Sequence, residues 1–248
     1  LKDTTIGFLL AAQTRGHNID YAELDHLFIK NGQGGVRARS IELSPQEKPF
    51  YQLGQYQTME LSTYDSIWMR KDPPVDRAYL HATHILDLAG QDTLVVNSPT
   101  GVRFANEKLY ALQFPDLIPD TLVTRSLEQI KSTLTDGGRP LIVKPVDGHG
   151  GAGIFLLKPG DRNTSSILET LSDEGQKWVV VQEYLPAARE GDKRIILIDG
   201  HVCGAILRVP QDDDNRGNIH VGGQVVHTEL TEEDQRICHE VGPRLRQD

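Results

Sequence analysis

The sequence predicts an α/β fold, because short apolar segments with strand character alternate with segments of helical spacing along much of the chain. In the first part of the chain this alternation favours a mainly parallel sheet. A second observation is a compact α+β unit at 121–185, which surrounds a glycine-rich loop. The third is the length of 248 residues, which allows one large domain or two smaller ones.

The composition narrows the class of protein. With 38% hydrophobic and 25% charged residues, the chain is typical of an ordinary globular protein. A net charge of −9 disfavours nucleic acid as the main partner, since phosphate binding needs a basic face. We find no apolar run as long as a membrane span and no signal peptide. Cys203 and Cys238 are too few and too arbitrarily spaced for a disulfide scaffold or a zinc site, so a cytoplasmic location is expected.

The N-terminal part begins with a predicted helix and continues mostly as strands. Asp3 or Thr4 can cap this helix, and Gly16 ends it. Asn31-Gly32 is a hairpin turn signal. Residues 44–63 show no clear period. The other elements expected here are strands at 17–21, 27–29, 36–43, 66–69 and 94–97, and a helix at 79–89.

Polar residues follow two of these strands. Arg70 and Lys71 come after 66–69, and Asn97 and Ser98 come at the end of 94–97. In parallel sheets ligands bind at the carboxyl ends of strands, which makes these residues candidates for a binding site. A solvated turn explains Arg70 and Lys71 equally well.

The C-terminal part shows clear end signals for several elements. Ser126 caps a helix that Gly137-Gly138 ends, Asp199-Gly200 predicts a hairpin turn, and Thr231 caps a final helix. A helix at 101–112 is expected to carry Lys108. The remaining elements are strands at 121–124, 178–181, 195–198 and 201–209, and helices at 127–134 and 164–171.

The glycine-rich loop lies between two apolar segments within 142–157. The first segment delivers Lys144, and the glycines allow several backbone N–H groups to converge on an anion. These glycines are Gly148, Gly150, Gly151 and Gly153. A lysine beside such a loop indicates a binding site for the phosphates of a nucleotide. The alternative is a glycine-rich hairpin that binds no ligand.

Two other nucleotide motifs are excluded. The glycine spacing fits the dinucleotide fingerprint G-x-G-x-x-G, but that fingerprint requires the glycines to open a helix. Here the apolar segment 154–157 and the turn Lys158-Pro159-Gly160 follow, so the unit is strand, loop, strand. A P-loop fails because no Gly-Lys-Ser or Gly-Lys-Thr follows.

Residues 210–224 are polar and rich in glycine, which predicts a loop that closes over the site as a lid. The acidic run 212–214 within it is interpreted as solvated rather than as a cation site.

Motifs along the whole chain resemble one known family. In order they are Met-Arg-Lys-Asp-Pro-Pro at 69–74, Asn-Glu-Lys-Leu at 106–109, the glycine loop with its lysine at 144–153, Gln-Glu-Tyr-Leu-Pro at 182–186, Gly-Asp-Lys-Arg at 191–194 and Arg-Gly-Asn at 216–218. Each motif alone is weak, but their joint order is specific. The chain closely resembles the bacterial glutathione synthetases, a family of ATP-grasp ligases.

The resemblance implies a domain plan and an activity. It implies an N-terminal substrate-side α/β domain at 1–103 and an ATP-grasp domain at 104–248, in which 121–185 forms a lid subdomain. It implies that γ-glutamylcysteine is joined to glycine through an acyl phosphate, with ATP cleaved to ADP and phosphate. It also implies a homo-oligomer, commonly a tetramer, with small-molecule substrates and neither nucleic acid nor membrane as partners.

The resemblance also implies roles for particular residues. Those matched to ATP binding are Lys108, Lys144, Gly148, His149, Gly150, Gly151, Gln182, Glu183, Tyr184, Leu185 and Asp192. Those matched to substrate binding are Arg70, Asn97, Ser98, Asn218 and Gly223, and those expected around the reacting groups are Arg194, Arg208 and Arg216.

Simpler interpretations exist for several of these residues. Lys108 would be a solvated lysine on the surface of its helix, and His149 a loop side chain turned to solvent. Glu183 and Asp192 could be ordinary surface charges, and Arg208 could pair with a neighbouring carboxylate.

The family also needs Mg²⁺, but its Asp, Glu and Asn ligands are expected beyond Asp248, so we name no metal ligand here. Its first strand is likewise expected before Leu1, and Gln224 stands where some relatives carry Arg. If these residues were the complete polypeptide, we would expect little or no ligase activity. Two alternatives to glutathione synthesis remain. One is another ATP-grasp carboxylate–amine ligase, and the other, which the missing metal ligands would explain, is an ATP-binding module without catalysis.

Overall fold

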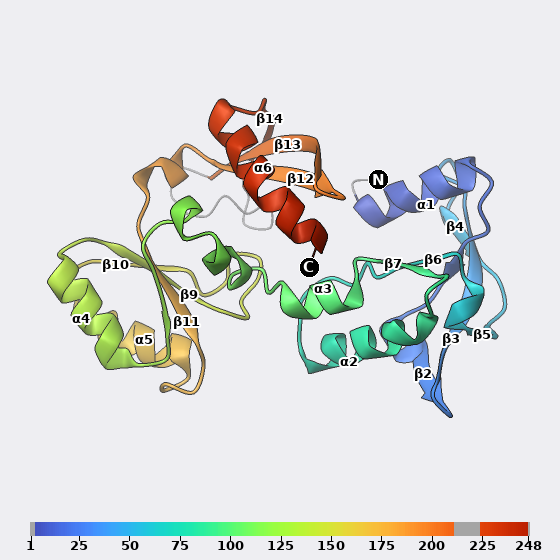
Figure 1. The fold of residues 1–248 in the computed structure, drawn as a ribbon, viewed down its shortest axis with the longest axis horizontal. Helices are drawn as coiled ribbons and strands as arrows, with labels where there is room; N and C mark the ends of the chain where they lie inside the picture. Colours follow the sequence, from blue (N-terminus) through green and yellow to red (C-terminus); the bar gives the residue numbers. More distant parts are fainter. Residues whose placement is uncertain (1–2, 211–223, 248) are drawn as a thin grey trace. The chain divides into compact units, whose positions relative to one another are not determined.

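The computed structural model describes residues 3–210 and 224–247. The chain divides into two compact units, Leu1–Phe104 and Ala105–Asp248, which are described separately. Figure 1 draws the first unit in blue to green and the second in green to red. No helix in the described part of the chain is both long and apolar enough to cross a membrane.

The first unit is built mainly from short strands. Its helices are α1 (Thr4–Thr14), α2 (Arg77–Leu86) and α3 (Pro99–Phe104), with short 3-10 turns η1 (Leu24–His26), η2 (Leu61–Thr63) and η3 (Asp87–Ala89). Its strands are β1 (Asp20–Tyr21), β2 (Leu27–Lys30), β3 (Gln33–Leu43), β4 (Tyr51–Leu53), β5 (Gln57–Glu60), β6 (Ser66–Trp68) and β7 (Leu94–Val96).

The long strand β3 organises a five-stranded sheet, since it pairs antiparallel with β1, β2, β4 and β5. The prediction of a mainly parallel sheet is therefore wrong for this unit: among the described strands, parallel pairing is confined to β6 and β7, where Trp68 lies opposite Val96. Strands β4 and β5 fall within 44–63, for which the sequence predicted no element. Both are short and mostly exposed, so they lack the apolar alternation that marks a strand.

Local signals in the first unit are confirmed. The carboxylate of Asp3 accepts hydrogen bonds from the backbone N–H groups of Thr5 (2.7 Å) and Ile6 (3.1 Å), which caps α1. Asn31 and Gly32 have φ of 52° and 82°, as the predicted tight hairpin turn requires. The core of this unit contains Val36, Ala38, Leu61, Leu86 and Ala89.

The second unit contains two sheets. Its helices are α4 (Leu127–Gly137), α5 (Thr164–Ser172) and α6 (Glu232–Gln247), with 3-10 turns η4 (Tyr110–Gln113), η5 (Pro115–Leu117) and η6 (Pro186–Arg189). Its strands are β8 (Thr121–Thr124), β9 (Leu141–Pro145), β10 (Phe155–Leu157), β11 (Val179–Glu183), β12 (Asp192–Ile198), β13 (His201–Val209) and β14 (Gln224–His227).

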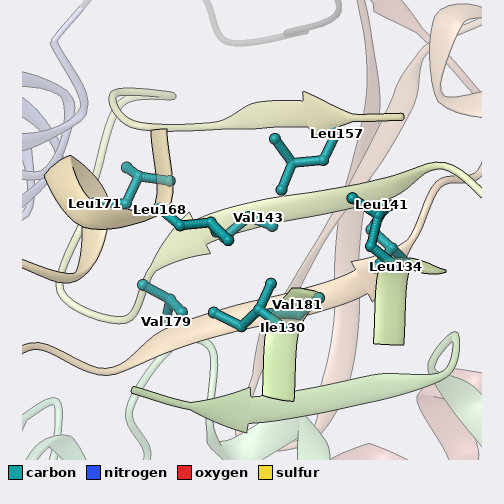
Figure 2. Packing of buried hydrophobic residues seen from close by; sticks show 9 residues of the cluster. All are labelled: Ile130, Leu134, Leu141, Val143, Leu157, Leu168, Leu171, Val179 and Val181. Atoms are coloured by element: carbon teal, nitrogen blue, oxygen red, sulfur yellow. The ribbon is translucent and has the colours of Figure 1, made fainter. Parts of the chain in front are cut away.

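The first sheet of this unit has the antiparallel order β10-β9-β11-β8. Alternate residues of its strands pack against α4 and α5, and Figure 2 shows the resulting core. Its members are Ile130, Leu134, Leu141, Val143, Leu157, Leu168, Leu171, Val179 and Val181. Because side chains alternate along a strand, Lys144 and Gln182 fall on the opposite face of this sheet.

The second sheet has the order β12-β13-β14 and packs against α6. The predicted turn at Asp199-Gly200 joins β12 to β13, with φ of 50° and 76°. A Cβ added to Gly242 in α6 would lie 2.6 Å from the carbonyl oxygen of Gly200, so only glycine permits this approach. Lys193 on β12 forms an ion pair with Asp234 near the start of α6.

The predicted helix at 101–112 is wrong. Helix α3 ends at Phe104, and the chain forms a turn before η4 begins at Tyr110. The side-chain oxygen of Asn106 accepts hydrogen bonds from the backbone N–H groups of Lys108 (3.0 Å) and Leu109 (3.1 Å). Such local side-chain bonds compete with helical hydrogen bonds, which explains the break.

Candidate active site

Lys144 lies near the end of β9, on the face of the sheet away from the core. It is opposite Val180 on β11, and Gln182 is two residues further along that strand. A lysine side chain can reach such a diagonal neighbour. The Lys144 ammonium donates a hydrogen bond of 2.7 Å to the side-chain oxygen of Gln182.

Lys108 reaches the glycine loop from a distant part of the sequence. Its ammonium donates to the carbonyl oxygens of Val146 (2.9 Å) and Gly148, and it pairs with the carboxylate of Glu107 at 2.6 Å. Only 15% of its side chain is exposed, so Lys108 is not a solvated surface lysine. The structure thus brings two lysines, one from β9 and one from a turn, to the same loop.

The surroundings of Lys144 disfavour the protonated form of its side chain. Burial lowers the pKa of Lys144 below its ordinary value, and the like charge of Lys108 lowers it further. Both effects favour loss of the proton. A negative charge beside the loop would offset both effects.

The glycines of the loop are required for two different reasons, backbone conformation and lack of space for a side chain. Gly150, Gly151 and Gly153 have φ of 63°, 82° and 73°, a region that other residues rarely adopt. At Gly148 an added Cβ would lie 2.6 Å from Cγ of Pro145, so the restriction there is steric. His149, which lies between Gly148 and Gly150, is exposed.

The predicted adenine-side segment follows directly from β11. The backbone N–H of Glu183 donates to Asp120 (3.1 Å), and that of Tyr184 donates to Pro140 (3.2 Å). The Glu183 carboxylate pairs with Arg139 at 2.8 Å. Within the described residues the buried Tyr184 hydroxyl has no hydrogen-bond partner. Leu185, which comes next, is half exposed.

The second sheet carries charged residues on one face. Asp192 on β12 lies opposite Arg208 on β13, and Arg194 is two residues further along the same face. Arg208 Nε lies 3.2 and 3.0 Å from the two carboxylate oxygens of Asp192, and Nη2 also donates to this carboxylate. The structure therefore shows the pairing of Arg208 with a neighbouring carboxylate, while the Arg194 side chain is exposed.

The three remaining described candidates belong to the first unit. Arg70 follows β6, and Asn97 and Ser98 follow β7, so all three lie at the carboxyl ends of the parallel pair. The Ser98 hydroxyl oxygen accepts the backbone N–H of Gly101 (3.2 Å) at the start of α3. The Arg70 guanidinium lies 5.5 Å from the ring centre of Phe8. Arg70 and Asn97 are exposed, which leaves them accessible to a ligand.

Arg216, Asn218 and Gly223 lie outside the described residues, as does most of the predicted lid. In residues 3–210 and 224–247, no group of three or more His, Cys, Asp or Glu side chains is placed to hold a metal ion.

Two contacts at the site were not predicted from the sequence. The Gln182 side-chain N–H donates to the hydroxyl of Thr121 at 2.8 Å, and Arg139 holds Glu183. The two residues of each pair are far apart in the sequence, and strand register or loop packing brings them together. No local sequence pattern therefore predicts either contact.

Comparison with known proteins places the chain in a family. Residues 1–103 match the family model described as the N-terminal domain of prokaryotic glutathione synthetase, and residues 107–248 match its ATP-grasp domain. The glutathione synthetase of Thermosynechococcus vestitus is 45% identical over 256 residues, covering 99% of this chain and 80% of the relative. That of Gloeobacter violaceus is 47% identical over 249 residues, covering 98% of this chain and 76% of the relative.

A solved structure shows the same fold at lower identity. The ATP-grasp ligase PsnB, complexed with a precursor variant, Mg and ADP, has a TM-score of 0.56 and 18% identity, covering 99% of this chain and 79% of that chain. The fold, the lysines at the glycine loop and the two family matches agree: the chain belongs to the prokaryotic glutathione synthetase family.

Proposed function

We propose that this protein is an ATP-dependent ligase that joins γ-glutamylcysteine to glycine and so forms glutathione. The observation that carries the proposal is the placement of Lys108 and Lys144 at one glycine loop, in a chain whose relatives are glutathione synthetases. Two ammonium groups and a glycine loop suit the phosphate tail of ATP, which is the most highly charged part of the substrates.

The chemistry takes two balanced steps. A carboxylate oxygen of the cysteinyl residue attacks the γ-phosphorus, the bond to the bridging oxygen breaks, and ADP leaves with that electron pair. The amine of glycine then attacks the acyl carbon, gives up a proton, and phosphate leaves. Phosphoryl transfer of this kind needs positioning and charge stabilisation rather than a protein nucleophile.

We assign the nucleotide to the first sheet of the second unit. Lys108 and Lys144 hold the phosphates, and the loop from Gly148 to Gly151 covers them. Glu183, Tyr184 and Leu185 are assigned to adenine through their backbone, with Gln182 beside Lys144. The contacts that support this assignment are those of Lys108 with the loop and of Lys144 with Gln182.

We assign Arg208 and Arg194 to the reacting phosphate and carboxylate, because both lie on one face of the β12–β13 pair. Asp192, which the resemblance matched to the ribose, holds the Arg208 guanidinium in the present arrangement. A bidentate carboxylate fixes the plane of a guanidinium, so Asp192 orients Arg208 whether or not it also contacts ribose.

The remaining assignments concern the acceptor substrate. Arg70, Asn97 and Ser98 are assigned to γ-glutamylcysteine, whose carboxylates need cationic or hydrogen-bond-donating partners. From the resemblance alone, Asn218 and Gly223 are assigned to the same substrate, and Arg216 is assigned with Arg194 and Arg208 to the reacting groups.

The family also implies Mg²⁺, which would neutralise charge on the phosphates. The described residues hold no group that fits such an ion, and none of the assigned roles depends on one. We further propose a cytoplasmic homo-oligomer, a tetramer by resemblance, with neither nucleic acid nor membrane as partner. The free thiols of Cys203 and Cys238 suit a reducing compartment.

The test supplies the full-length protein with ATP, Mg²⁺, γ-glutamylcysteine and glycine, and measures phosphate and glutathione. Phosphate release that ignores γ-glutamylcysteine would refute the proposal. Other carboxylates in its place distinguish a ligase of different specificity, and tight ATP binding without turnover would identify a binding module.

Two variants test the nucleotide site itself. Lys144→Ala should weaken ATP binding far more than Lys158→Ala, because Lys144 lies beside the loop while Lys158 is exposed after β10. Calorimetry with a non-hydrolysable ATP analogue measures both. Equal effects of the two substitutions would count against the assignment.

A further inference from the structure

A chain of hydrogen bonds crosses the first sheet of the second unit on the face opposite its core. Lys144 donates to the side-chain oxygen of Gln182 (2.7 Å), whose side-chain nitrogen donates to the Thr121 hydroxyl (2.8 Å). That hydroxyl donates to the carbonyl of Pro119 (2.6 Å). Strand register makes the chain possible, since Gln182 on β11 lies directly opposite Thr121 on β8.

Both ends of the chain set its direction. An ammonium group only donates hydrogen bonds, and a backbone carbonyl only accepts them. The Thr121 hydroxyl therefore gives its single hydrogen to Pro119, and its oxygen is left to accept from the Gln182 nitrogen. This turns the amide oxygen of Gln182 toward Lys144. With the amide reversed, its NH₂ group would face the ammonium, and two donors would oppose each other.

We propose that Thr121 is a positioning residue for ATP binding: it orients the Gln182 amide so that the amide oxygen holds the Lys144 ammonium beside the glycine loop. The inference rests on the proposed function, because Lys144 is the group assigned to the phosphates. Thr121 acts through Gln182.

The surroundings of Lys144 show why an oriented acceptor matters. Burial and the charge of Lys108 both disfavour its protonated form. No carboxylate in the described part of the chain forms an ion pair with Lys144. The neighbouring strand β10 carries no titratable residue, and on β11 the carboxylate of Glu183 pairs with Arg139 instead. The Gln182 oxygen is thus the acceptor that stabilises the charged form.

Thr121→Val tests the inference, because valine keeps the shape of threonine and removes the hydroxyl. The Gln182 nitrogen then loses its acceptor, and we expect the Kd for a non-hydrolysable ATP analogue to rise about five- to tenfold. As the pH is raised, the variant should also lose its affinity at a lower pH than the unsubstituted protein does. The reason is that Lys144 without an oriented acceptor loses its proton at a lower pH. Thr121→Ser restores the hydroxyl and should restore both properties.

A matched control separates this effect from general loosening of the strand. Thr124 is the last residue of β8, and its hydroxyl contacts Gln129 and the backbone N–H of Ser126. Thr124→Val should lower the Tm without changing the pH dependence of ATP affinity. In a Gln182→Met background, Thr121→Val should have no further effect on affinity, since the intermediate group is gone.

The outcomes are distinct. Unchanged affinity and pH dependence in folded Thr121→Val, or failure of Thr121→Ser to restore them, would overturn the inference. Should the valine variant not fold, Thr121→Ala carries the same expectation. If Lys144→Ala retains full affinity, the assignment of the ATP site itself is wrong. If Lys144→Ala binds weakly while Thr121→Val binds normally, only the role of Thr121 is refuted.

Discussion

Replacing Lys108 by methionine tests whether this lysine holds the glycine loop. Methionine has a similar length but no donor, so the carbonyls of Val146 and Gly148 lose their charged partner. Each hydrogen bond to a charged group contributes about 1.5–3 kcal/mol, and water can replace part of this at the loop carbonyls. We therefore expect the free energy of unfolding to fall by about 2–3 kcal/mol.

The same substitution should change the titration of a second lysine. The charge of Lys108 contributes to the lowered pKa of Lys144, so the pKa of Lys144 should rise toward its ordinary value in Lys108→Met. Burial is unchanged and should keep part of the shift. Urea unfolding measures the stability, and NMR titration of ¹³C-labelled lysine side chains measures the pKa.

Lys158→Met is the matched control for this experiment, because Lys158 is exposed and should change neither property. ATP affinity should fall in Lys108→Met, since one of the two cations that we assign to the phosphates is lost. A Lys144 pKa that stays unchanged or falls, or stability equal to that of the unsubstituted protein, would refute the view that Lys108 lies over the loop.

Two further substitutions test the loop and the second sheet. Gly148→Ala places a methyl group 2.6 Å from Cγ of Pro145, which should cost about 1–3 kcal/mol of stability and weaken ATP binding, whereas Gly137→Ala meets open space and should do neither. For Asp234, burial alone would raise the pKa, but hydrogen bonds from Lys193 and a backbone N–H outweigh it and lower the pKa. Its stabilising effect is therefore present above the unfolded pKa and lost as the pH falls through the folded one, so Asp234→Asn should flatten the acid side of stability measured by urea unfolding at stepped pH.

Local signals predicted much of the fold. The strand–loop–strand arrangement around Lys144 followed from an apolar segment on each side of the glycines, and Ser126 caps α4 as expected, accepting the N–H of Gln129. The failures have local physical causes too. Asn106 forms a side-chain turn that ends helix formation, although residues 101–112 have helical spacing.

Only part of the candidate site could be predicted from the sequence. Lys144 could be found because it precedes the loop directly. The resemblance matched Lys108 to ATP binding, but no local signal placed it beside the loop, because its bond to Gly148 spans 40 residues and depends on how two segments fold together. The bond between Gln182 and Thr121 spans 61 residues and is set by strand register. Shifting that register by one residue would point Thr121 into the core.

Because side chains alternate between the two faces of a strand, the first sheet of the second unit has its core residues on one face and its candidate site residues on the other. On β9 and β11, Val143 and Val181 are buried in the core beneath α4 and α5. Their neighbours Lys144 and Gln182 lie on the other face and form the polar chain. The packing of the apolar residues holds the register, and the register places the polar ones. A core substitution that preserves the register should therefore lower stability without altering the pH dependence of ATP affinity, whereas Thr121→Val should alter that dependence through the polar face.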